Sequence, residues 1–126
     1  METYQVEGLL ALSERDLLIM IGSDVASEES RFFPPDSGEL IKKATEWLNT
    51  KHAHLQSVVC SNNVVISFYK KDDLVALIVA IADLIASLCV NVSPFSVAAL
   101  ITKKGVSVLC ENVWEPADVT QDKGRQ

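Results

Sequence analysis

The sequence LVALIVAIADLIASLCVNV, residues 74–92, is the most apolar segment of the chain. Two aspartates that can cap a helix precede it, and Ser93-Pro94 follows it, a pair typical of the cap and first position of another helix. Asp83 lies near its middle, where a carboxylate costs about 2.5–3.5 kcal/mol in a bilayer. We therefore expect a buried central helix of a bundle rather than a membrane span.

Capping patterns predict further helices on both sides of this segment. Ser13 with Asp16, and Asp36 with Glu39, form capping boxes ahead of apolar residues at helical spacing. Gly105 follows two lysines and is a typical helix end. These signals predict helices over residues 13–25, 37–60 with a bend near 49–50, 74–92 and 94–104.

The predicted fold is an all-α, compact bundle of about five to six helices around the central apolar helix. Residues 1–112 form a single domain in this prediction, and residues 113–126 a disordered tail. Residues 64–69 leave an alternative open, because their β-branched and aromatic side chains also suit a strand. In that case residues 64–69 pair with residues 106–110, and the fold is α+β.

Size and charge are those of an ordinary globular protein. The chain has 126 residues and a mass of 13.8 kDa, with 48% hydrophobic and 22% charged residues, which fits one domain with its own core. The formal net charge is −6, from 17 acidic and 11 basic residues, and the lysines occur mostly in isolated pairs. Nucleic-acid binding requires clustered cations, so DNA and RNA are not expected partners.

The first ten residues and the cysteines indicate a cytoplasmic protein. METYQVEGLL lacks the cationic start and apolar run of a secretory signal. Cys60, Cys89 and Cys110 are odd in number and widely spaced, and are expected to be reduced.

No catalytic or metal-binding pattern is present in the sequence. His52 and His54 are two residues apart on a predicted helix, so their side chains point in nearly opposite directions and cannot share a metal ion. We therefore predict no enzyme, no cofactor and no metal. The alternative is a small Cys-His hydrolase that uses Cys60, although a continuous helix holds this thiol away from both imidazoles.

A stripe of small and polar residues is the strongest candidate for a partner-binding surface. Ala76, Ala80, Asp83 and Ser87 fall on one face of the apolar helix, away from its large aliphatic residues. This face either contacts a partner or a second copy, or allows another helix of the same domain to approach closely. Phe32 and Phe33, before two prolines, form a second candidate as an aromatic anchor.

Three short motifs together resemble those of short helical companion proteins of bacterial conflict and antiphage effectors. They are Leu12-Ser13-Glu14-Arg15-Asp16-Leu17-Leu18 with Ile21-Gly22, Val59-Cys60-Ser61-Asn62, and Ala82-Asp83-Leu84-Ile85. The resemblance covers residues 8 to 110. It implies an adaptor or regulator that contacts a larger effector, and it transfers no catalytic residue.

The sequence as a whole therefore predicts a cytoplasmic protein-interaction module, an adaptor or regulatory subunit that binds another protein or itself. A second hypothesis is a membrane-active or membrane-regulated small effector that uses residues 74–92 after opening.

Overall fold

A computed structural model describes residues 3–26, 36–111 and 113–114, and in these residues the regular elements are all helical. This result confirms the all-α prediction. The α+β alternative is wrong, because residues 64–69 and most of residues 106–110 lie in helices. The elements are α1 (Thr3–Ala11), α2 (Glu14–Ala26), α3 (Ser37–Cys60), α4 (Asn63–Lys71), α5 (Leu74–Ile85), a 3-10 helix η1 (Ala86–Leu88), α6 (Pro94–Lys104) and α7 (Val106–Leu109).

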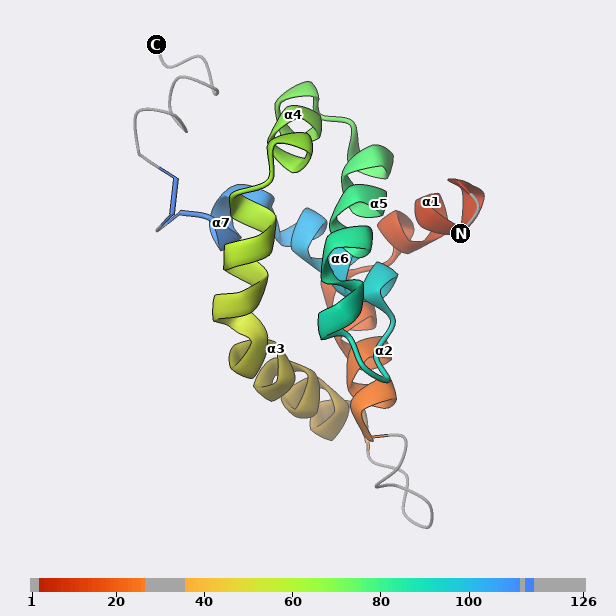
Figure 1. Cartoon of the computed structure of the whole chain (residues 1–126). Coiled ribbons are helices and arrows are strands. Elements are labelled where there is room, and N and C mark those ends of the chain that lie inside the picture. Colours follow the sequence, from red (N-terminus) through yellow and green to blue (C-terminus); the bar gives the residue numbers. More distant parts are fainter. Residues whose placement is uncertain (1–2, 27–35, 112, 115–126) are drawn as a thin grey trace.

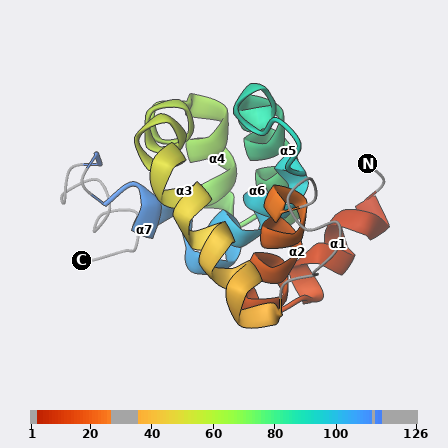
Figure 2. The ribbon, with the colours of Figure 1, turned by 90° about the horizontal axis from the view of Figure 1, so that it is seen from below.

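The helix enclosed on most sides is α6. Figures 1 and 2 show α6 inside the bundle, with α1 and α2 on one side, α3 and α7 on the other, and α5 across its face. Six consecutive residues of α6, 96–101, are buried. Several of them are small, which lets neighbouring helices pack closely around α6. The more apolar α5 instead keeps one face open.

The predicted central helix is shorter than expected. It ends at Ile85 and continues as the 3-10 helix η1, and Asn91 then adopts a left-handed conformation with φ 67°. At 1.5 Å per residue, the 12 residues of α5 span about 18 Å, well short of a bilayer core. Within the described part of the chain, no helix combines the length and the apolarity that crossing a membrane requires.

Local capping explains where the helices begin. The Asp36 carboxylate accepts a hydrogen bond from the Glu39 amide at 2.9 Å, and the Ser13 hydroxyl accepts one from the Asp16 amide at 3.0 Å. Asp73 and Ser93 cap α5 and α6 in the same way. The predicted caps are therefore confirmed, and each satisfies an amide that the helix leaves without a backbone partner.

Helices α2 and α3 form the most extensive helix pair in the bundle. Gly22 makes their close approach possible, because a Cβ at this position would overlap the backbone carbonyl of Leu40. Figure 1 shows that α3 curves along its length. Thr45 and Thr50 donate hydroxyl hydrogen bonds to carbonyls of preceding turns, at 2.9 and 2.7 Å, and such bonds commonly bend helices.

The end of the described chain docks on α3 and α4. Trp114 packs against Tyr69 with ring centroids 5.3 Å apart, and its indole Nε1 donates to the Cys60 carbonyl at 2.9 Å. The sequence predicts a tail over residues 113–126, yet Trp114 makes these contacts with the bundle. Residues 112 and 115–126 lie outside the described residues.

Candidate partner-binding groove

Three of the four predicted stripe residues line a groove on the surface of α5. Ala76 and Ala80 are half-buried and Asp83 is exposed. Ser87 is also exposed, but it lies in η1 and does not line the groove. The stripe therefore faces outward on α5 and is not covered by another helix among the described residues.

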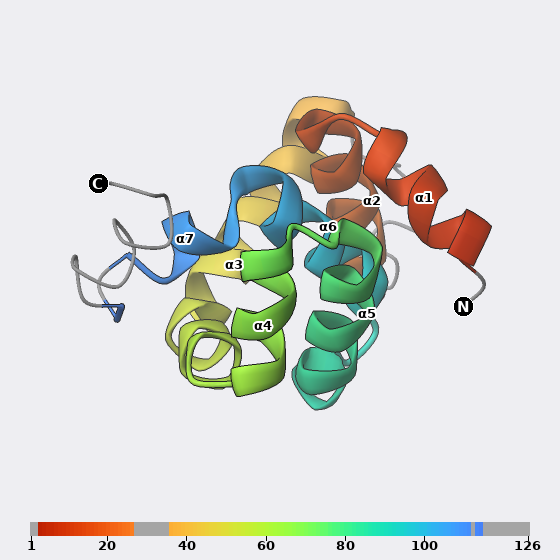
Figure 3. The ribbon, with the colours of Figure 1, turned by 90° about the horizontal axis from the view of Figure 1, so that it is seen from above.

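The groove is formed where α4 and the start of α6 flank α5. Figure 3 shows α4 and α5 side by side, with α6 behind them. Besides the three stripe residues, it is lined by Phe68 from α4, Val79, Ala82 and Ala86 from the α5 segment, and Pro94 and Phe95 from α6. Its volume is about 570 Å³. Two half-buried phenylalanines therefore border a floor of small residues.

The groove combines an apolar lining with a single charge. Val79 is 43% exposed although it is a large aliphatic residue. Among the described residues, Asp83 is the only charged one that lines the groove, and no lysine or arginine of that part of the chain lines it. An apolar surface with one carboxylate suits a partner that brings an apolar face and one cation.

The second predicted anchor cannot be placed. Phe32 and Phe33 lie outside the described residues.

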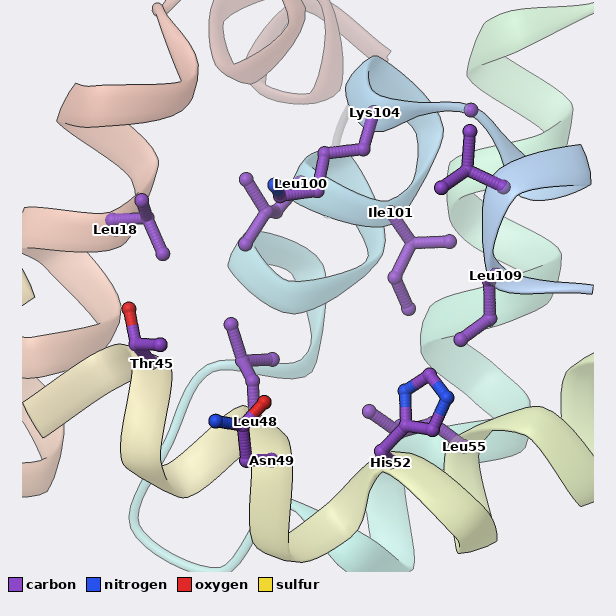
Figure 4. Close-up of a pocket in the computed structure, with 12 residues that line it drawn as sticks. Leu18, Thr45, Leu48, Asn49, His52, Leu55, Leu100, Ile101, Lys104 and Leu109 are labelled. Atoms are coloured by element: carbon purple, nitrogen blue, oxygen red, sulfur yellow. The ribbon is translucent and has the colours of Figure 1, made fainter.

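The two histidines are surface residues. His52 and His54 are both exposed on α3. Over residues 3–26, 36–111 and 113–114, no group of three or more histidine, cysteine or acidic side chains is placed to hold a metal ion. His52 instead lines a cavity between α3 and α6 (Figure 4).

The cysteines correct the expectation that all three are reduced. Cys60 and Cys110 form a disulfide bond between the end of α3 and the residue after α7. Both are buried, at 2% and 0% exposure. The Cys60 sulfur is therefore not a free thiol, and the hydrolase that was the alternative hypothesis lacks its nucleophile in this structure.

Cys89, the remaining thiol, is buried beside α5. Burial raises the pKa of the Cys89 thiol above its ordinary value, and the positive charge of Lys51 opposes this shift only in part. A thiol that stays protonated at neutral pH is a poor nucleophile, so Cys89 acts as a small apolar core residue.

The comparisons with known proteins identify no relative. No protein-family model, no curated protein and no solved structure matches this chain. What the groove binds is therefore inferred from its own geometry and charge.

The cavity of Figure 4 could not be found from the sequence. Its lining comes from α2, α3, α6, Gly105 and α7, and Leu18 and Leu109 are 91 positions apart in the sequence. The sequence contained one signal, the polar residue His52 close to apolar Leu48 and Leu55 on a predicted helix. That signal is shared by most amphipathic helices.

Proposed function

We propose that the chain is a protein-interaction module, an adaptor or regulatory subunit, and that the α4–α5–α6 groove holds a helix of a larger protein. The observation that supports this proposal is the groove along α5, where the half-buried Ala76 and Ala80 lie beside the exposed side chains of Val79 and Asp83. An apolar patch of this kind on a small protein commonly marks an interaction site.

A helix is the occupant that suits the shape of the groove. Ala76 and Ala80 have short side chains, so the backbone of a partner helix can approach α5 closely. Phe68 and Phe95 stand on either side of these residues, on α4 and α6, and give two walls against which an apolar helix face can pack. A lysine or arginine on the partner helix could pair with the exposed Asp83 carboxylate.

A second copy of the chain is a weaker candidate for this occupant. If two α5 helices packed stripe to stripe, each Asp83 would lie against a groove to which residues 3–26, 36–111 and 113–114 contribute no lysine or arginine. Two carboxylates would then lose solvent without gaining a partner, which destabilises the complex. The charge of the groove therefore favours a different protein, and self-association becomes one outcome of the test. The resemblance of the sequence to companion proteins of antiphage effectors suggests that this binding partner is a larger effector protein.

The location proposed for this module is the cytoplasm. The Cys60–Cys110 bond bears on this proposal, since disulfides are rare in reducing compartments. Burial of both sulfurs shields the bond from small thiols, so it is slow to be reduced once formed.

The redox state of the Cys60–Cys110 pair in cells is measured by quenching the cells in acid and alkylating the free thiols. One alkylated cysteine per chain indicates that the bond is formed, and three indicate that it is absent.

The test of the groove is a charge reversal. Asp83→Arg places a cation where we propose that the partner's cation lies, and we expect binding to weaken by about 30-fold or more. Glu46→Arg is the matched control, because Glu46 is exposed on α3 and makes the same change of charge outside the groove.

Both variants are purified from the native host with bound proteins, and their helix content is checked by circular dichroism. Loss of one partner from Asp83→Arg alone, with both variants folded, supports the proposal. Equal recovery of the partner by both variants contradicts it. Sedimentation velocity of the wild-type chain detects self-association. If the wild-type chain is a dimer that Asp83→Arg dissociates, the occupant of the groove is a second copy of the chain and not a different protein.

A further inference from the structure

A cavity between α2, α3, α6 and α7 shares no residue with the α4–α5–α6 groove. Its volume is about 280 Å³. The buried side chains of Leu55, Leu100 and Ile101 form its apolar interior, and Leu18 and Leu48 extend the lining toward α2 (Figure 4). This is the apolar surface that small-molecule sites use to hold a ligand body.

The mouth of the cavity is polar and carries positive charge. Lys104 and His52 lie on opposite sides of it, on α6 and α3, with Asn49 beside His52 (Figure 4). None of the 12 lining residues is an aspartate or a glutamate, although the chain has a net charge of −6. The mouth therefore favours an anionic group over a cationic one.

Lys104 already pairs with one carboxylate, that of Glu14, which does not line the cavity. Its Nζ lies 3.7 Å from Oε1 of Glu14 on α2, and both side chains are about half exposed, at 51% and 48%. An ion pair this exposed contributes little to stability and is readily exchanged. A ligand carboxylate can therefore take the place of Glu14 beside Lys104.

The volume limits the size of the ligand. An apolar cavity of roughly 150 Å³ holds one benzene ring, so a cavity of this size holds about twice as many atoms, roughly ten to twelve besides hydrogen. A medium-chain fatty acid has this size, an apolar body and a single carboxylate.

We propose that this cavity binds a medium-chain monocarboxylate, with its hydrocarbon part against Leu100 and Ile101 and its carboxylate at Lys104. The site is separate from the proposed protein groove and does not depend on it. The ligand would contact α7 as well as α3, because Val108 and Leu109 form the wall on that side.

The experiment is a titration of the methyl-labelled full chain with decanoate, followed by NMR. Saturable shifts are expected at the methyl groups of Leu48, Leu100 and Ile101, and not at Val79 in the groove. Lys104→Met keeps the aliphatic stem and removes the charge, and we expect about five-fold weaker binding. Lys103→Met is the control, since its Nζ hydrogen-bonds to the Leu10 carbonyl and does not line the cavity.

Two further measurements separate this site from general hydrophobic binding. Glu14→Gln removes the competing carboxylate and is expected to tighten decanoate binding about two-fold. Decyltrimethylammonium has the same chain and the opposite charge, and is expected to bind more weakly than decanoate. Absence of saturable shifts in the cavity, shifts at Val79 instead, equal binding of the cation, or equal effects of Lys103→Met and Lys104→Met would each overturn the proposal.

Discussion

Removing the Cys60–Cys110 disulfide is expected to lower the stability of the bundle strongly. The two cysteines are 50 residues apart in the chain, so the bond closes a long loop in the unfolded state. In the chain-entropy model, a loop of this length lowers the entropy of the unfolded chain by about 14 cal/mol/K, equivalent to about 4 kcal/mol at 25 °C. For a domain of this size, that corresponds to about 15 °C in melting temperature.

The reduced chain should nevertheless keep its fold. Gln56 Nε2 donates to the Leu109 carbonyl at 2.9 Å, and Trp114 Nε1 donates to the Cys60 carbonyl at the same distance. Each bond contributes about 1 kcal/mol, and Val106 stays buried in the core. We therefore expect α7 to remain docked on α3 in the reduced protein, with a less stable native state.

Urea denaturation with and without a phosphine reductant measures this difference. The wild-type chain should lose about 4 kcal/mol on reduction, whereas a Cys60→Ala, Cys110→Ala double variant should be insensitive to the reductant. Cys89→Ala is the matched control and should retain the full difference. Equal stability of the oxidised and reduced wild-type chain, with thiol titration proving complete reduction, would refute the reasoning.

Two further predictions concern the close contact of Gly22 with α3 and the buried thiol of Cys89. Gly22→Ala is expected to lower the free energy of unfolding by about 2–3 kcal/mol, because its Cβ meets the Leu40 backbone. Gly8→Ala, where a Cβ meets no atom within 4 Å, should instead raise it by up to about 1 kcal/mol, and urea midpoints that move alike would contradict this contrast. Burial raises the pKa of the Cys89 thiol in the folded chain. The stability that the buried neutral thiol contributes is therefore complete below the ordinary thiol pKa of about 8.5. It is lost as the pH rises toward the higher pKa of Cys89 in the folded chain. Unfolding measured between pH 7 and 10 should show this loss in the wild-type chain, and an equal loss in Cys89→Ala would assign it to other groups.

The sequence predicted those features that short-range chemistry determines. Asp36 with Glu39 marked the start of α3, and Ser93-Pro94 marked that of α6, because a cap and the amide it satisfies are three residues apart. The prediction for residues 64–69 remained open for a related reason. Their β-branched side chains favour a strand, but Asn62 caps the segment from outside and accepts bonds from the Val64 and Val65 amides.

Features formed by distant residues were not predictable from local patterns. The disulfide joins residues 50 positions apart, and three widely spaced cysteines gave no pattern that pairs two of them. The early end of α5 was missed because apolar residues continue past Ile85, and hydropathy alone does not report the left-handed Asn91. The stripe of α5 was identified by helical spacing, but its exposure depends on where α4 and α6 lie.

Photo-crosslinking from the groove tests its proposed role most directly. Benzoylphenylalanine replaces Val79, which is 43% exposed in the groove, and in a second protein it replaces exposed Ala53 on α3. Irradiation in host cells is expected to join the Val79 probe to one partner protein, and Asp83→Arg is expected to abolish that product. The same products from both positions, no product at Val79, or a Val79 product that persists in Asp83→Arg would contradict a partner helix in this groove.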